Sequence, residues 1–196
     1  MISAIVLAAG RATRFGTSKI VAPLWGTPLV RHVVDRLQRA GIDEAVVVAG
    51  EASEAIAHAV QGTGARVVVN RDPATGLSGS LRVGLRSVSP DADAILVALG
   101  DQPLIDASVV DGMIAAWRSL RGTIVVPVYN GERGNPVLFD RSLRPVLEAL
   151  EGDRGARDLL ADHGGAVYRF RVQAAAPKDV DTVDDLAGLE RSVGAG

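Results

Sequence analysis

Short runs rich in valine and isoleucine alternate with helical patterns along most of this chain. Five such runs occupy residues 2–7, 45–49, 65–69, 94–99 and 123–128. Runs that are apolar at nearly every position are typical of strands in a parallel sheet covered on both faces. Strands separated by helices form βαβ units, so the sequence predicts an α/β protein of three layers, α/β/α, around a mostly parallel central sheet.

Helical periodicity is clearest over residues 29–40, where the apolar residues recur on one face. Thr27 is expected as the N-cap of this helix, with Pro28 in the first turn and Gly41 after the last turn. Past residue 128 the pattern is less regular, and residues 129–134 are rich in turn formers. We expect further helices at 107–120 (capped by Asp106), 141–150, 153–160 and 183–192, and strands at 135–139 and 167–172.

Length and composition limit the classes of function. The 196 residues suit one domain, taken as 1–196, and a formal net charge of −2 argues against a nucleic-acid partner. The absence of cysteine excludes disulfides, thiolate catalysis and cysteine-bound metals. No apolar run approaches the roughly 20 residues of a membrane span, and no basic segment precedes the first strand. We therefore expect a cytoplasmic protein that does not enter a membrane.

Residues 7–19, LAAGRATRFGTSK, lead from the first expected strand into a glycine-bearing loop. This stretch has three cations, Arg11, Arg14 and Lys19, and no acid. Small residues let the backbone approach a ligand closely, free N–H groups can point at phosphate oxygens, and the cations can neutralise phosphate charge. The loop predicts a polyphosphate site, and the alternative is a basic surface turn.

The spacing of the loop excludes the two most familiar phosphate-binding motifs. A P-loop requires GxxxxGK[ST], but here five residues separate Gly10 from Gly16, and Lys19 comes three positions after the second glycine. A dinucleotide fingerprint requires GxGxxG, and its second glycine is replaced by Ala12. The remaining pattern, LAAGxxxRxGxxK, resembles the signature loop of nucleotidyltransferases with the MobA-like fold, and within them the molybdenum cofactor cytidylyltransferases.

This resemblance implies a Rossmann-like nucleotidyltransferase fold and a role for the loop. The backbone of its first residues would approach the base and ribose. Arg14 and Lys19 would hold the β- and γ-phosphates and act catalytically by stabilising the departing pyrophosphate. The implied nucleotide-binding residues of the loop are Leu7, Ala8, Ala9, Gly10, Arg14, Gly16 and Lys19.

Asp101 follows directly after an apolar strand, in the sequence Gly100-Asp101-Gln102-Pro103. A carboxylate at such a position must be solvated, hydrogen-bonded or bound to a cation, because burying it alone is costly. Mg²⁺ prefers one or two carboxylates together with phosphate oxygens and water, whereas a turn or cap aspartate is equally common before proline. The stretch resembles the family's GDxP motif, which implies that Asp101 is a catalytic, nucleotide-binding and metal-binding residue.

Asp181 precedes the last expected helix. Thr182 and Asp185 have the spacing of a capping box, which explains both of these residues and leaves Asp181 over. The stretch VDTVDDL at 180–186 resembles the family's D[IV][DN]Tx[ED][DE]L motif, whose third position is a metal ligand and varies between Asp and Asn. The resemblance therefore implies that Asp181 is the second ligand of Mg²⁺ or Mn²⁺.

Residues 76–81, GLSGSL, open another expected helix with small side chains. Hydroxyl and N–H groups at a helix N-terminus can bond a base or a phosphate, and helix capping by Ser78 is an equally good explanation. The family has a similar segment in its nucleotide pocket. The resemblance implies nucleotide contacts by Gly76, Ser78 and Ser80.

Residues 134–139 and 152–157 form a further pair of motifs, GNPVLF and GDRGAR. In the cytidylyltransferases a similar pair lies on the side of the second substrate. Arg154 and Arg157, at the start of an expected helix, could hold a phosphate there, and a solvated surface turn is the alternative.

Together these motifs imply a metal-dependent nucleotidyltransferase that joins CMP from CTP to the pterin phosphate of molybdenum cofactor and releases pyrophosphate. Ala9 favours CTP, since guanylyltransferases commonly show LAGG in this loop, and so does the segment at 152–157. A molybdenum enzyme or a chaperone is the transient protein partner that the resemblance implies. The alternatives are a GTP-dependent guanylyltransferase, another small-molecule cytidylyltransferase, and a nucleotide-binding partner protein without turnover.

Overall fold

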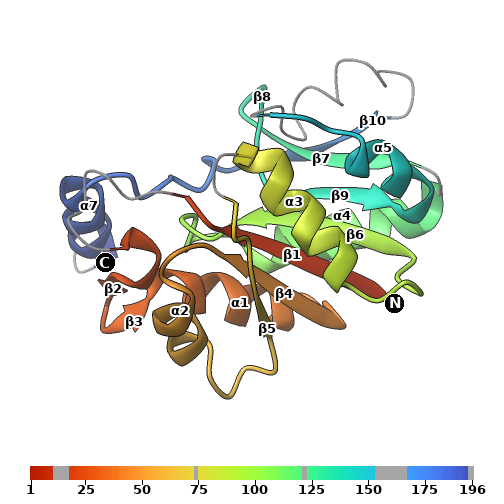
Figure 1. The fold of residues 1–196 in the computed structure, drawn as a ribbon. Coiled ribbons are helices and arrows are strands. Elements are labelled where there is room, and N and C mark those ends of the chain that lie inside the picture. Colours follow the sequence, from red (N-terminus) through yellow and green to blue (C-terminus); the bar gives the residue numbers. More distant parts are fainter. Residues whose placement is uncertain (11–17, 73–74, 121–122, 153–166, 194–196) are drawn as a thin grey trace.

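The centre of the structure is a twisted sheet with helices on both faces (Figure 1). The computed structural model describes residues 1–10, 18–72, 75–120, 123–152 and 167–193. The strands of the sheet are β1 (Ile2–Ala8), β4 (Glu44–Ala49), β5 (Arg66–Val69), β6 (Ala94–Leu99), β7 (Ile124–Tyr129), β8 (Glu132–Arg133), β9 (Val137–Asp140) and β10 (Val167–Val172). They follow the order β10-β7-β9-β6-β1-β4-β5, with β8 paired to β7. The helices are α1 (Leu29–Arg39), α2 (Ser53–Ala59), α3 (Gly76–Ser87), α4 (Ala107–Leu120), α5 (Arg144–Glu148) and α7 (Val183–Val193).

The sheet is mostly parallel, as the sequence predicted. β1 lies between β4 and β6 and is parallel to both, and β5 is parallel to β4. Among the described strands of this sheet, only β9 and the short β8 run against their neighbours: β9 is antiparallel to both β6 and β7, and β8 is antiparallel to β7. The carboxyl ends of β1, β4, β5 and β6 therefore lie at one edge of the sheet, where open α/β sheets bind their ligands.

Both faces of the central strands β1, β4 and β6 are buried, which explains why these strands are apolar at nearly every position. Along β1, Ala4 and Val6 belong to the core shared with α1, α2 and α4. Ile5 and Leu7 point the other way, into the core shared with α3 and α5. This alternation confirms the three-layer α/β/α architecture.

The beginning of α1 differs from the expectation. Thr27 and Pro28 form the short strand β3 (Thr27–Pro28), which pairs with β2 (Pro23–Leu24), so Thr27 does not cap the helix. The tight turn at Trp25 and Gly26, with φ of 49° and 78°, folds this ribbon back and keeps Thr27 extended. Pro28 is itself the N-cap and makes no side-chain cap bond. Gly41, with φ of 69°, follows the helix as predicted.

The chain after β9 also differs. The helix expected at 141–150 is divided into a 3₁₀ turn, Arg141–Leu143, and the short α5. The Asp140 side chain accepts a hydrogen bond from the Ser142 N–H and so caps the 3₁₀ turn. Asn130 and Gly131, both with positive φ, close the hairpin between β7 and β8. The helix predicted at 153–160 lies outside the described residues, and no described helix is long and apolar enough to cross a membrane.

Candidate active site

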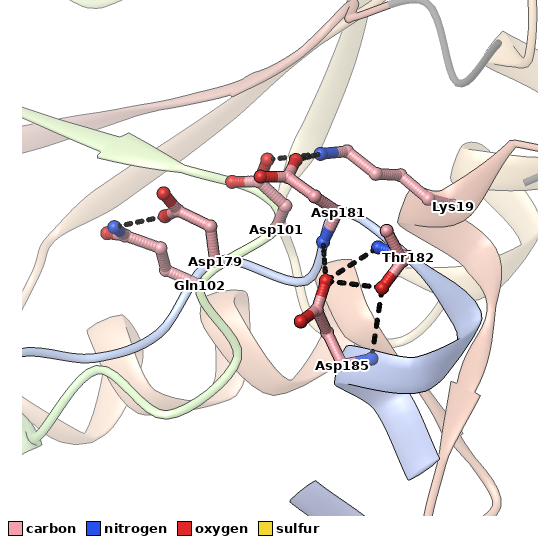
Figure 2. A network of polar contacts seen from close by, with 7 residues as sticks. All are labelled: Lys19, Asp101, Gln102, Asp179, Asp181, Thr182 and Asp185. Carbon is pink, nitrogen blue, oxygen red and sulfur yellow. Dashed lines mark hydrogen bonds and ion pairs between the residues drawn. The ribbon is translucent and has the colours of Figure 1, made fainter. Parts of the chain in front are cut away.

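Lys19, Asp101 and Asp181 meet beyond the carboxyl end of β1 and β6 (Figure 2). The Lys19 ammonium Nζ donates to Asp101 Oδ2 and to Asp181 Oδ1, and both distances are 2.7 Å. The two aspartates that the sequence singled out as metal ligands therefore share one cation, although they come from opposite parts of the chain.

Each of these side chains is delivered by a different element. Lys19 opens the 3₁₀ turn η1 (Lys19–Val21), Asp101 follows β6 directly, and Asp181 precedes α7. The Lys19 and Asp101 side chains are mostly buried, with 13% and 20% of their surface exposed, while Asp181 is 60% exposed. The cluster therefore has one open side, on which Asp181 stands.

The charge of Lys19 is secured by its partners. Burial alone would lower the pKa of this ammonium, but the hydrogen bonds and charges of Asp101 and Asp181 outweigh that effect and raise the pKa above its ordinary 10.5. Lys19 is therefore a permanent cation at neutral pH, able to neutralise a carboxylate or a phosphate.

The donor set fits a divalent cation that also binds phosphate. Two carboxylate oxygens that both reach one ammonium nitrogen can also reach one small cation. Within the described residues no cluster of three or more acidic or histidine side chains forms a closed metal site. An ion held by Asp101 and Asp181 would take its other ligands from water and substrate, as Mg²⁺ commonly does in phosphoryl-transfer sites.

The start of α7 keeps Asp181 available. Asp185 accepts hydrogen bonds from the Thr182 N–H and Oγ1, at 2.8 and 2.7 Å, and the Thr182 Oγ1 accepts from the Asp185 N–H at 3.1 Å. This is the reciprocal capping box that the sequence predicted. The Asp181 N–H also donates to Asp185 Oδ2, at 3.1 Å, so its backbone is fixed while its carboxylate faces Lys19.

The end of β1 is packed tightly against its neighbours. Leu7 and Ala8 are paired within the sheet, and the Leu7 carbonyl accepts from the Gly100 N–H at 2.9 Å. A Cβ on Gly100 would lie 3.2 Å from the Leu7 carbonyl oxygen, so a larger residue here would require its neighbours to shift slightly. Ala9 and Gly10 lie past the paired strand, and Gly10 has open space where a Cβ would stand. Of the four residues predicted to approach base and ribose, these two have backbone outside the sheet.

Gly76, Ser78 and Ser80 lie together in the first turns of α3, which begins two residues before Ser78. Gly76 has φ of 65°, a conformation that favours glycine. Both serine side chains are buried: Ser78 Oγ donates to the Thr75 carbonyl at 3.2 Å, and Ser80 Oγ accepts from Asn70 Nδ2 at 3.0 Å. These contacts support the loop that leads into α3. A nucleotide contact by any of the three residues stays a prediction.

Other predicted residues are not placed. Arg14, Gly16, Arg154 and Arg157 lie outside the described residues. Gly152, the first residue of the motif at 152–157, is bound to α3: the Ser78 N–H donates to the Gly152 carbonyl at 3.2 Å.

Sequence reasoning missed Gln102 and Asp179, which adjoin the site. Gln102 Nε2 donates to Asp179 Oδ1 at 2.6 Å, beside the pair formed by Asp101 and Asp181 (Figure 2). Asp179 stands at the first position of the motif D[IV][DN]T, and this was the available signal. Gln102 had none, because its partner lies 77 residues away.

Comparison with known proteins decides the family. The family model of the MobA-like NTP transferase domain matches residues 4–167, which include most of β1 and the turn after β6. The chain belongs to this family. The match confirms the family that the motifs predicted. Membership of this family supports nucleotidyl transfer as the class of activity.

Individual relatives agree on the family and differ in their named activities. Nicotine blue oxidoreductase from Paenarthrobacter nicotinovorans is 30% identical, over 96% of each chain. The 3-deoxy-manno-octulosonate cytidylyltransferase of Geobacter metallireducens is 35% identical over 74% of this chain, and the match spans 62% of that enzyme.

A solved relative covers almost the whole chain. Rv0371c from Mycobacterium tuberculosis superposes with a TM-score of 0.87 at 34% identity, covering 97% of both chains. A structure of the same protein in complex with manganese gives a TM-score of 0.83 at 33% identity, covering 97% of this chain and 98% of that one.

Proposed function

We propose that this chain is a metal-dependent cytidylyltransferase that transfers CMP from CTP to the terminal phosphate of molybdopterin. A phosphate oxygen of the acceptor would attack the α-phosphorus of CTP and form the new P–O bond. The bond between the α-phosphorus and the bridging oxygen would break, and pyrophosphate would leave with the electron pair. The observation that carries the proposal is that Asp101 and Asp181 both reach the Lys19 ammonium nitrogen, each at 2.7 Å.

The chain's own residues would act by position and charge. The acceptor phosphate is already an anion, so no protein nucleophile is required, and catalysis would consist of alignment and charge stabilisation. Asp101 and Asp181 would hold Mg²⁺ or Mn²⁺, which supplies Lewis-acid neutralisation of the α-phosphate when bound. Lys19, released from the carboxylates, would pair with the phosphates of the leaving pyrophosphate, together with Arg14. The open backbone at Ala9 and Gly10 would adjoin the nucleoside.

Metal and nucleotide identity have separate support. Rv0371c has been crystallised with manganese, and this chain carries two carboxylates suited to such an ion. CTP is supported by the Geobacter cytidylyltransferase and by Ala9 in the loop. The molybdopterin acceptor is supported by the resemblance of the loop LAAGxxxRxGxxK, and of the segments at 134–139 and 152–157, to the molybdenum cofactor cytidylyltransferases.

Pyrophosphate release tests the proposal. The purified protein would be incubated with Mg²⁺ or Mn²⁺, molybdopterin and each of CTP and GTP, and the product identified by mass spectrometry. We expect release with CTP and a CMP-bearing pterin. A preference for GTP would make the protein a guanylyltransferase, transfer to another acceptor would make it a different cytidylyltransferase, and nucleotide binding without release would identify a non-catalytic partner. Asp101→Ala is expected to abolish release while circular dichroism shows an intact fold.

The relative named nicotine blue oxidoreductase supports one competing function, the oxidation or reduction of a small molecule. Its match covers 96% of this chain. The GxGxxG fingerprint of dinucleotide-binding enzymes is missing, since Ala12 stands at its second glycine. Oxidation of a reduced nicotinamide cofactor in the presence of nicotine blue, followed by absorbance, separates this function from nucleotidyl transfer. Turnover in that assay, with no pyrophosphate release in the other, would replace our proposal.

A further inference from the structure

The segment 179–181 crosses the turn after β6 and is attached at three consecutive residues (Figure 2). The Val180 N–H donates to the Asp101 carbonyl at 3.0 Å. The Val180 side chain is fully buried and packs with Leu24, Leu29 and Leu189. On either side of Val180, the carboxylates of Asp179 and Asp181 reach Gln102 and Lys19. The position of Asp181 therefore depends on the attachment of its two neighbours.

Gln102 makes the side-chain part of this attachment. Only 6% of the residue is exposed, and its Nε2 donates to Asp179 Oδ1 at 2.6 Å. Its Oε1 is buried and has no hydrogen-bond partner among the described residues. Turning the amide over would place that oxygen against the carboxylate, so the bond to Asp179 determines how the amide lies. A buried amide that keeps one group unsatisfied is costly to hold, and stability by itself would favour an apolar side chain here.

We propose that Gln102 is a positioning residue, which sets the place of Asp181 opposite Asp101 by holding Asp179. Asp101 and Gln102 are consecutive in the turn after β6. Lys19 joins Asp101 to Asp181, and Gln102 bonds Asp179 directly. A shift of the 179–181 segment would separate the two carboxylates that converge on Lys19. This inference rests on the proposed function, since it assigns Asp101 and Asp181 to a divalent cation.

The test is Mn²⁺ binding to the full-length protein without nucleotide, measured by titration calorimetry alongside the thermal midpoint of unfolding. Gln102→Met keeps the side chain's length and adds no charge, while Asp179→Ala removes the other half of the bond. We expect each to weaken Mn²⁺ binding by about tenfold or more, the usual effect of losing a residue that orients a metal ligand. The double variant should bind no more weakly than the weaker single variant, because both changes remove the same bond.

Two control variants separate positioning from other effects. Asp179→Asn keeps an oxygen that accepts from Gln102 and should bind Mn²⁺ nearly as the wild type does. Asp184→Ala removes an exposed carboxylate from the same region, which matches the charge change of Asp179→Ala without touching Gln102. Loss of affinity in Asp184→Ala equal to that in Asp179→Ala would show a general charge effect and overturn the inference.

The outcomes distinguish the inference from the proposed function. If Asp101→Ala binds Mn²⁺ as tightly as the wild type, the metal assignment itself fails. If Asp101→Ala loses binding while Gln102→Met and Asp179→Ala retain it and only unfold at lower temperature, Gln102 is merely structural and the inference fails. Should Gln102→Met not fold, Asp179→Ala still tests the bond, because Asp179 is exposed.

Discussion

Lys19 neutralises two carboxylates in the structure, whereas the proposed reaction uses its charge on a phosphate. Both arrangements satisfy the ammonium, since a carboxylate and a phosphate oxygen are equivalent partners for a point charge. A divalent ion bound by Asp101 and Asp181 would take the place of Nζ between the two oxygens. In the proposed site, Lys19 and the metal would thus compete in the absence of nucleotide and would act together in its presence.

Lys19→Met separates these two effects. Without nucleotide we expect Mn²⁺ to bind at least roughly tenfold more tightly, because a unit charge about 4 Å away contributes a few kcal/mol even at an effective dielectric constant of 20. Pyrophosphate release should fall by about 100-fold or more, the usual loss when a charge-stabilising group is removed. Calorimetry and a pyrophosphate assay measure the two quantities.

Lys178→Met is the matched control for this prediction. Lys178 is an exposed cation that acts on Asp185 through its charge and makes no described bond to Asp101 or Asp181. It should leave both affinity and turnover close to the wild type. Equal changes in the two variants would mean that Lys19 acts through general charge only, contrary to the geometry.

The residues of the site were predictable where their neighbours in sequence carried the signal. Lys19, Asp101 and Asp181 each stand in a motif with its own spacing, and the structure brings the three together. Gln102 carries no such signal, because its partner lies 77 residues away and only the folded chain shows the bond. The bonds of Ser78 to Thr75 and of Ser80 to Asn70 are more local, but they too follow from how the chain folds before α3.

Among the elements, the strands were the most predictable and the segments with local side-chain bonds the least. β6 and β10 begin and end where the sequence predicted. The predicted N-cap of α1 was wrong, and so was the prediction of one unbroken helix at 141–150. Both features depend on local geometry, a hairpin turn at Trp25 and a cap by Asp140. α2 has only seven residues and follows its strand too closely for periodicity to reveal it.

The packing of α3 on β1 requires a glycine. A Cβ on Gly84 would lie 2.5 Å from Ile5 Cγ2, inside a buried strand whose branched side chain cannot withdraw. We expect Gly84→Ala to lower the free energy of unfolding by about 1–3 kcal/mol, as overpacked cores do. Urea denaturation followed by circular dichroism measures this change.

Gly188→Ala provides the comparison within another helix. Gly188 lies in α7 and has no atom within 4 Å of where a Cβ would stand. Here alanine should raise the free energy of unfolding by about 0.5–1 kcal/mol, because glycine is a poorer helix former. Destabilisation by both substitutions, or by neither, would show that the close approach of α3 to β1 is not what requires glycine at position 84.

In the molecule as a whole, the two edges of the sheet have different roles. Lys19 and Asp101 lie at the carboxyl edge, and their cluster is open to solvent on the side of Asp181. The amino edge is closed by Glu44, which accepts from Ser3 Oγ at 2.7 Å, from the Ser89 N–H at 2.8 Å and from Arg66 at 2.8 Å. Glu44 thus joins the beginnings of β1, β4, β5 and the chain before β6. Topology alone predicted the first edge as the site, but nothing in the sequence indicated this closure.

Acid should weaken this closure without affecting the site directly. Burial by itself would raise the pKa of Glu44, but the hydrogen bonds from Ser89, Ser3 and Arg66 outweigh it and hold the pKa below its ordinary 4.5. A carboxyl group with a depressed pKa stabilises the fold fully above its unfolded pKa, and that contribution is lost as the pH falls through the folded value. The wild type should therefore lose stability from about pH 4.5 downward.

Glu44→Gln makes this dependence measurable. We expect its free energy of unfolding at pH 7 to be about 1–2 kcal/mol below that of the wild type, since hydrogen bonds to a charged acceptor are replaced by weaker ones. The difference should be constant above pH 5 and should narrow below about pH 4.5, where the wild-type carboxylate takes up a proton. Glu190→Gln, on the exposed side of α7, should show no such narrowing. A difference that stays constant from pH 7 to pH 3 would contradict the prediction, because it would mean that the charge of Glu44 contributes nothing to closing the amino edge.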